Sequence, residues 1–206
     1  MPLIVIGGHS RSVGKTSVVA GLIAALPEYN WTAVKISQHD HGARAAEDHS
    51  WAISEEQDRS GNSDTSRFLA AGASHAWWVR SEPGCLAEAM PAVRRALAGS
   101  QNAILESNSI LKFLCPDLYL VVVDPATADF KQSGQEFLDR ADAVILHENQ
   151  AQEFVWSETL MKPVAGRPLF RISPPQYVTP QIVEFVREKL RKTSPQGSQT
   201  NAEQLP

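Results

Sequence analysis

The segment at residues 8–16, with the sequence GHSRSVGKT, constrains this chain more than any other feature. It stands between a short apolar run at 3–6 and a run with helical periodicity at 16–26, which Pro27 ends. Glycines in such a loop let successive backbone N–H groups point inward, and the following helix offers unpaired N–H groups and the positive end of its dipole. The segment therefore predicts a loop that binds phosphate groups.

The residues of this loop have different expected roles in binding a nucleoside triphosphate. Lys15 brings a full positive charge to the β- and γ-phosphates, and the Thr16 hydroxyl is placed to ligate Mg²⁺. The commonest form of the loop has glycine where this chain has His9, so the loop here is slightly longer. We expect nucleotide contacts from the first glycine to the start of the helix: Gly8, His9, Ser10, Arg11, Ser12, Val13, Gly14, Lys15, Thr16 and Ser17.

The order of apolar segments along the chain predicts one α/β domain over 1–191. Strands are expected at 3–6, 31–36, 74–79, 103–106, 118–123, 143–146 and 168–172, and helices at 16–26, 64–71, 85–97, 133–140, 152–161 and 179–191. This alternation of six or seven strands with helices predicts a three-layer, doubly wound, mostly parallel sheet of the P-loop NTPase type. The polar stretch 192–206 predicts a disordered tail.

The stretch 37–62 is polar, rich in His, Asp, Glu, Ser and Gly, and carries no sustained apolar period. It is either a mobile loop that responds to a ligand or an insertion without a role. Within it, His39, Asp40 and His41 follow one another, so both imidazoles point the same way if the chain is extended. Substrate contact is favoured there over a transition-metal site, and solvent exposure stays open.

The composition argues against several classes of protein. The formal net charge is -4 and the pI is about 5.9, which argues against binding to nucleic acid. No apolar run approaches the ~20 residues of a membrane span. The two cysteines, Cys85 and Cys115, lack the spacing of a zinc site, and we expect a cytoplasmic protein with reduced thiols.

Three acidic residues stand at or near the expected ligand crevice, which the carboxyl ends of parallel strands line. Glu106 ends a strand and is a candidate Mg²⁺ ligand or water-orienting catalytic carboxylate; the alternative is a cap or surface carboxylate. Asp64 opens a helix, so it is either a helix cap or a metal ligand. Asp124 either serves the same edge or forms a turn with Pro125.

Two further residues are candidates for contacts with substrate and base. Lys35, near the end of the second strand, either holds an anionic substrate or the γ-phosphate, or extends to solvent. Asn149 follows the strand 143–146 and can both donate to and accept from the edge of either purine. There is no Asn-Lys-x-Asp signature, so GTP and ATP both stay open. Pro174 and Pro175 either border the base or form an ordinary loop.

On these residues the chain resembles the molybdopterin-guanine dinucleotide biosynthesis protein B (MobB) family, and the wider P-loop class that contains dethiobiotin synthetase. The loop ending VGKT at 13–16 is similar to the dethiobiotin synthetase form. The segment DTSRFLAAGA at 64–73 is similar to a MobB-family helix with an Asp-Ser…Arg…Ala-Gly-Ala pattern. ILES at 104–107 stands where that family has a Val-Glu-Gly-Phe type motif, and 35–41 resembles its Lys-His segment.

The resemblance implies that Thr16, Asp64 and Glu106 share one Mg²⁺, that Lys15 holds the nucleotide phosphates, and that Lys35 lies near a second substrate. It implies a GTP-binding adaptor for a nucleotidyltransferase of molybdenum-cofactor biosynthesis. We expect slow hydrolysis, because no Gln or Arg is evidently placed to stabilise the transition state. An ATP-dependent ligase or kinase acting on a small carboxylate is the alternative, and a non-catalytic, nucleotide-gated module is a third. A monomer and a homodimer both stay open.

Overall fold

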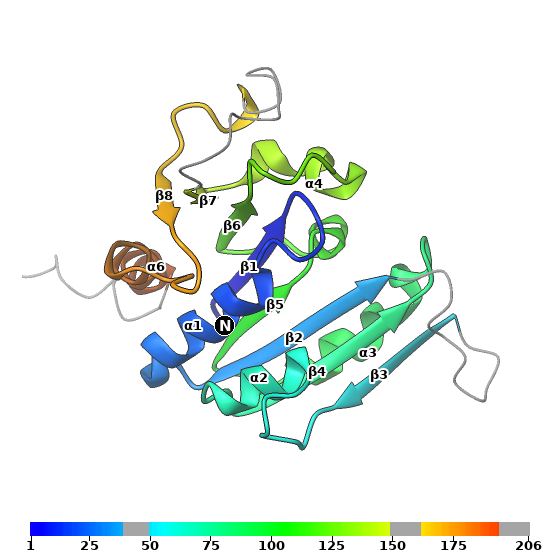
Figure 1. The fold of residues 1–206 in the computed structure, drawn as a ribbon. Helices are drawn as coiled ribbons and strands as arrows, with labels where there is room; N and C mark the ends of the chain where they lie inside the picture. The colour runs from blue at the N-terminus through cyan, green and yellow to red at the C-terminus, as the bar shows by residue number, and fades with distance from the viewer. Residues whose placement is uncertain (39–49, 149–161, 194–206) are drawn as a thin grey trace, which may run out of the picture.

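The computed structural model describes residues 1–38, 50–148 and 162–193, and it arranges them in three layers (Figure 1). Its strands are β1 (Leu3–Gly8), β2 (Trp31–Gln38), β3 (Trp51–Glu55), β4 (His75–Ser81), β5 (Asn102–Glu106), β6 (Leu118–Val123), β7 (Ala143–His147) and β8 (Leu169–Ile172). Its helices are α1 (Lys15–Ala25), α2 (Asp64–Ala70), α3 (Leu86–Leu97), α4 (Gln132–Glu136) and α6 (Pro180–Thr193). Short 3₁₀ turns lie at Pro27–Tyr29, Ser109–Lys112, Leu138–Arg140 and Lys162–Val164.

The strands form one sheet of eight in the order β3-β4-β2-β5-β1-β6-β7-β8. All neighbours pair in parallel except β3, which runs antiparallel to β4 at the edge. The expected doubly wound, mostly parallel α/β architecture of the P-loop NTPase type is therefore confirmed. Strand β1 lies between β5 and β6, so the loop after β1 meets the carboxyl ends of both neighbours.

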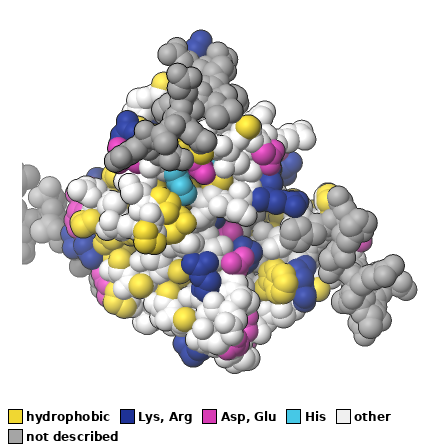
Figure 2. Space-filling model, viewed as in Figure 1, with side chains coloured by type: hydrophobic (Ala, Val, Ile, Leu, Met, Phe, Trp, Pro, Cys, Tyr) yellow, Lys and Arg dark blue, Asp and Glu magenta, His cyan; other side chains and the backbone are white. Residues whose placement is uncertain are grey.

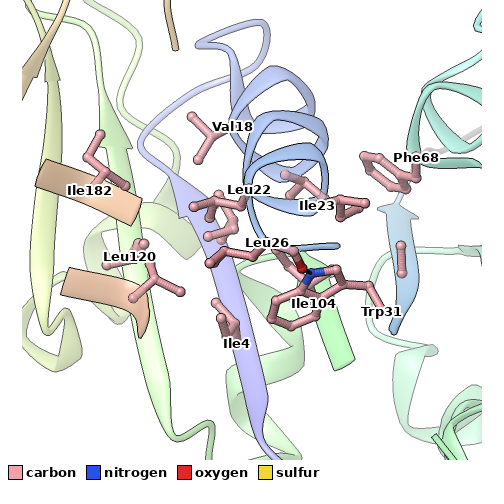
Figure 3. Packing of buried hydrophobic residues seen from close by; sticks show 14 of the residues in the cluster. Ile4, Val18, Leu22, Ile23, Leu26, Trp31, Phe68, Ile104, Leu120 and Ile182 are labelled. Atoms are coloured by element: carbon pink, nitrogen blue, oxygen red, sulfur yellow. Dashed lines mark hydrogen bonds between the residues drawn. The ribbon is translucent and has the colours of Figure 1, made fainter. Parts of the chain in front are cut away.

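Side chains alternate between the two faces of the sheet and build two cores. On one face α1, α2 and α6 pack on residues such as Ile4, Ile104 and Leu120 (Figure 3). In this core the buried Trp31 donates its indole N–H to the Leu26 carbonyl at 2.8 Å, which joins the start of β2 to the end of α1. On the other face α3 packs on residues such as Val5 and Val34. Strands β1, β5 and β6 are buried along their whole length, as expected of central parallel strands.

The sequence prediction needs several corrections. The loop expected over 37–62 is partly regular structure, because Ser37 and Gln38 extend β2 and Trp51–Glu55 forms β3. Eight strands replace the six or seven expected. The helix expected at 133–140 is only the short α4 followed by a 3₁₀ turn. The helix expected at 152–161 lies outside the described residues, as does most of the tail, from 194 onward. No described helix combines the length and the apolar character that crossing a membrane requires.

Candidate phosphate and cation site

The loop between β1 and α1 turns through two residues with left-handed backbone. Ser12 has a φ of 57°, and Gly14, which precedes the first helical residue, has a φ of 87°. No side chain caps α1 at this end. Among the described residues, no protein acceptor receives a hydrogen bond from the backbone N–H of Gly14, Lys15 or Thr16. These donors at a helix N-terminus, together with the dipole, are the elements of an anion site.

Two side chains fix the base of this loop from behind. The amide of Asn108 accepts from the Gly8 N–H at 2.9 Å and donates to the Gly8 carbonyl at 2.7 Å. His9 is buried, its ring nitrogens lie 3.3 Å from the Thr127 carbonyl and 3.4 Å from the Asp124 N–H, and burial lowers the pKa of its imidazole. The backbone N–H of His9 donates to the Val122 carbonyl. Both the ring and the backbone amide of His9 therefore hold the loop in place.

Gly7 has no room for a side chain, and this yields a stability prediction. A Cβ at this position would stand 2.2 Å from Asn108 Oδ1 and 2.6 Å from Tyr119 Oη. We expect Gly7→Ala to lower the free energy of unfolding by roughly 2–4 kcal/mol, because close-packed neighbours must move. The melting temperature should drop by roughly 5–12 °C for a chain of this size.

A double variant separates the cause of that loss. Asn108→Ala removes the nearest clashing atom, so Gly7→Ala should cost less in the Asn108→Ala background than in the wild type. Equal costs in the two backgrounds would show that Asn108 is not what resists a side chain at position 7.

Positive charge gathers at the mouth of the loop. The Lys15 ammonium donates to the Ser10 carbonyl at 2.6 Å across the loop. Burial lowers the pKa of Lys15 to about 8, opposed by Glu106 and reinforced by the cations of Lys131 and Lys35. Burial, and then the charge of Arg11, also lower the pKa of Lys131. The loop therefore holds cations that repel one another, an arrangement that a polyanion stabilises.

A second cluster lies next to the loop, where one ammonium is surrounded by oxygens. Lys35 Nζ lies 2.6 Å from Asp64 Oδ2, 2.8 Å from Glu106 Oε1 and 3.4 Å from Thr16 Oγ1. The Thr16 hydroxyl also donates to Glu106 Oε2 at 2.7 Å. Burial disfavours the charge on Lys35, but Glu106 and Asp64 outweigh it and raise its pKa. Four predicted site residues thus meet at one point.

The structure also decides between the alternatives that the sequence left open. Ser63, rather than Asp64, caps α2: its hydroxyl accepts from the Ser66 N–H at 3.0 Å and the Ser66 hydroxyl accepts from the Ser63 N–H at 2.7 Å. The Asp64 carboxylate is therefore left for Lys35. Glu106 is only 5% exposed, so it is not a surface carboxylate. Lys35 does not extend to solvent.

Asp124, by contrast, forms a local turn, which was the alternative to a place at the ligand crevice. Its carboxylate accepts from the Ala126 N–H at 3.0 Å and from the Thr127 hydroxyl at 3.1 Å. This is an ordinary turn after β6, which leaves Asp124 outside the oxygen cluster.

The oxygen cluster fits a hard divalent cation. Two carboxylates and a hydroxyl converge on one cationic atom, and oxygen donors of this kind are the ligands that Mg²⁺ prefers. The protein would supply only some of the ligands, since phosphate oxygens and water usually complete such a site. Among the described residues, no three His, Cys, Asp or Glu side chains come close enough to bind a metal together.

The far side of the loop is closed by the last residue of β7 and by a residue that follows β8. His147 Nε2 lies 3.0 Å from the Val13 carbonyl, and the rings of His147 and Tyr177 meet edge to face at 5.8 Å. Tyr177 lies so close to Gly14 that a Cβ there would stand 2.3 Å from its ring. A groove of about 860 Å³ between α1 and α6 runs from Tyr177 past Ser17 and Arg67. Arg67 donates to the Ser17 hydroxyl at 3.0 Å.

Some candidates fall elsewhere or were missed. Asn149 and the histidine pair His39 and His41 lie outside the described residues. Sequence reasoning missed the clamp by Asn108, the loop contact of Tyr177 and the cation of Lys131. The adjacency of Asn108 to Glu106 was a usable signal for the first. Nothing in the local sequence of the other two points to a loop more than a hundred residues away.

Comparisons with known proteins support the fold. No protein-family model matches the chain, and no curated protein sequence matches it significantly. Among solved structures, HypB from Helicobacter pylori in complex with nickel is 18% identical with a TM-score of 0.52, over 98% of this chain and 91% of that one. LpxK from Aquifex aeolicus in complex with ATP is 19% identical with a TM-score of 0.53, over 83% and 53%. This chain therefore spans about half the length of LpxK.

The same comparison gives little support to the expected resemblance to MobB. MobB from Bacillus subtilis is 16% identical with a TM-score of 0.40, over 92% of this chain and 98% of that one. A match at that level carries no argument. The comparisons establish the P-loop NTPase fold.

Proposed function

We propose that this protein binds a purine nucleoside triphosphate together with Mg²⁺ and hydrolyses it slowly. The observation that carries the proposal is the pairing of two sites at one sheet edge. Unpaired N–H groups of Gly14, Lys15 and Thr16 and the cations around them suit the phosphates. The oxygens of Thr16, Asp64 and Glu106 around a cation suit Mg²⁺ beside them.

Each residue has a role that follows from its place. Lys15 exchanges its bond to the Ser10 carbonyl for bonds to the β- and γ-phosphates. Thr16, Asp64 and Glu106 would hold Mg²⁺, which neutralises phosphate charge when bound. Glu106 remains the carboxylate best placed to orient a water molecule, because it is buried and already fixed by Thr16. Lys131 adds a cation to the phosphate region.

The proposal of slow hydrolysis concerns the basic side chains near the loop and whether one of them can reach the transferred phosphate. Lys131 repels Lys15, and Arg11 repels Lys131, so both cations belong to the surroundings of the loop. Fast phosphoryl transfer in this class of site depends on an arginine or glutamine aimed at the transferred group. Among the described residues, Arg67 is instead bonded to the Ser17 hydroxyl and faces the groove beside α1.

We propose GTP as the nucleotide and a role as an adaptor for a nucleotidyltransferase of molybdenum-cofactor biosynthesis, on the sequence resemblance to the MobB family. The base would lie beyond β7 and β8, near His147 and Tyr177, because these residues close the loop on that side. The second candidate is ATP-dependent phosphoryl transfer to a small carboxylate. It is favoured by Lys35, whose ammonium lies 3.4 Å from the Thr16 hydroxyl and so next to the proposed phosphate site.

Calorimetric titration with GTP and with ATP, each with Mg²⁺, tests the proposal. Binding of either triphosphate that weakens when EDTA removes Mg²⁺ is the expected result. Preference for GTP supports the adaptor, and preference for ATP supports the transfer reaction. The absence of binding for both nucleotides would overturn the proposal.

A further inference from the structure

Strands β2, β3 and β4 carry a half-buried surface of polar, aromatic and small residues next to the oxygen cluster around Lys35. Register places Lys35 beside Trp78 and Ser54, and Ser37 beside Arg80 and Ala52, all on one face of the sheet. Arg80 therefore lies roughly 6–7 Å beyond the row of Lys35, at two residues of strand rise. Figure 2 shows basic and apolar side chains side by side on this face. The surface is named here the β4 shelf, and comprises Ser37, Ala52, Ser54, Trp78 and Arg80.

Helix α2 covers the neighbouring rows but ends at the shelf. Phe68 and Leu69 pack in the same core as Ala33 and Ala76, which lie one row before Lys35 and Trp78. The first residue of α2, Asp64, meets Lys35. In the part of the chain that the structure describes, no helix crosses the carboxyl-terminal parts of β2 and β4 on the side of α2 (Figure 1). The shelf is thus the sheet surface directly beyond the oxygen cluster around Lys35.

Among the described residues, Arg80 is held in place by an aromatic ring and not by an anionic partner. Its guanidinium carbon lies 4.5 Å from the centre of the Trp78 indole, a cation–π arrangement that orients the plane of the group. The Trp78 indole N–H donates to the Ser37 hydroxyl at 3.2 Å, which fixes the ring in turn. Arg80 Nε is buried and has no hydrogen-bond acceptor among the described residues, and no described carboxylate pairs with the guanidinium.

We propose that the β4 shelf binds the carboxylate of a small planar acid, the second ligand of this protein. The carboxylate pairs with the two terminal nitrogens of the Arg80 guanidinium in the two-pronged geometry that arginine favours, since the buried Nε is out of reach of a ligand. A planar acid held in this way is coplanar with the guanidinium, so its body continues the plane in which Arg80 lies over the Trp78 ring. The inference rests on the proposed function for one point: the triphosphate at Lys15 would then face the bound acid across Lys35.

This assignment separates the two candidate functions. An acid bound next to the terminal phosphate is the arrangement that phosphoryl transfer to a carboxylate requires, with Lys35 between donor and acceptor.

Benzoate is the probe, and the indole N–H signals of the tryptophans in a ¹H–¹⁵N correlation spectrum are the readout. Trp78→Phe identifies the Trp78 signal by its loss. In the nucleotide-free protein, benzoate should shift that signal, and Arg80→Met should weaken the response at least tenfold. Arg80→Lys keeps the charge but not the planar pair of donors, so it should recover only part of the response. Benzamide, which lacks the charge, should leave the signal in place.

Two further variants keep the outcomes distinct. Arg95→Met, an exposed arginine on α3 across the sheet, should respond as the wild type does. Lys15→Ala should also keep the benzoate response, so failure of triphosphate binding and failure of the shelf are separate results. An unchanged Trp78 signal up to the solubility limit of sodium benzoate would overturn the shelf assignment. So would an equal response in Arg80→Met.

Discussion

Lys15→Ala is expected to weaken binding of Mg²⁺-GTP or Mg²⁺-ATP at least a hundredfold, which is about 3 kcal/mol of binding free energy. The reason is that Lys15 is the one ammonium that already lies across the loop, bonded to the Ser10 carbonyl at 2.6 Å. A bound triphosphate replaces this neutral acceptor with charged oxygens, and charge-assisted bonds are about twice as strong as neutral ones. Calorimetric titration of the variant and the wild type measures the loss.

Lys112→Ala is the matched control for this change. Its ammonium pairs with Glu136 at 3.0 Å on the surface, and both side chains are largely exposed. We expect triphosphate affinity close to that of the wild type, since exposed pairs contribute little. Unchanged affinity in Lys15→Ala, with an unchanged melting temperature, would remove the phosphate loop from the proposed function.

The same lysine predicts how affinity depends on pH. The ligand-free pKa of Lys15 is about 8, and a bound polyanion raises it further. A group whose pKa rises on binding contributes fully below the lower pKa, so affinity should be constant below about pH 8 and fall as pH rises above it. Lys15→Arg stays charged throughout this range and should lack that decline. A decline of equal slope in Lys15→Arg would assign the effect to another group.

The sequence was sufficient for the parts of the fold that follow from local patterns. The buried strands β1, β5 and β6 and the helix α1 have the predicted type, because long apolar runs and a proline stop are local signals. Strand β3 was missed for a physical reason. Trp51–Glu55 is short, ends in polar residues and is held by pairing with β4, which is a contact between distant segments.

The site divides in the same way. Thr16 and Glu106 were predictable, since a loop before a helix and an acid at a strand end are positions that the topology brings together. The partner of Lys35 was not predictable, because its ammonium reaches the carboxylates of Asp64 and Glu106 only after three segments assemble. The sequence left two interpretations of Lys35 open, an anionic ligand or extension to solvent. The structure places two carboxylates, which changes what Lys35 is expected to do.

Lys35→Met is expected to make the protein depend on divalent cations for stability. In the wild type, the Lys35 ammonium neutralises Asp64 and Glu106 at 2.6 and 2.8 Å, so a metal ion that binds there must displace it. Without it, the buried Glu106 and the nearby Asp64 repel each other, and losing one partner of a buried pair costs about 3–5 kcal/mol. We discount this to roughly 1–3 kcal/mol, because the Asp64 side chain is 44% exposed.

Added Mg²⁺ should reverse the loss, because the same oxygens then hold a metal ion with no competing ammonium. The melting temperature of Lys35→Met should rise with Mg²⁺ well beyond any rise in the wild type, and EDTA should cancel the gain. Bound Mn²⁺, counted by electron paramagnetic resonance in the absence of nucleotide, should show at least tenfold tighter binding than in the wild type. Lys112→Met, which disrupts an exposed pair, should change neither quantity. If Mg²⁺ stabilised Lys35→Met no more than the wild type, the oxygens around Lys35 would be its ion-pair partners alone, and the Mg²⁺ that accompanies the nucleotide would need another set of ligands.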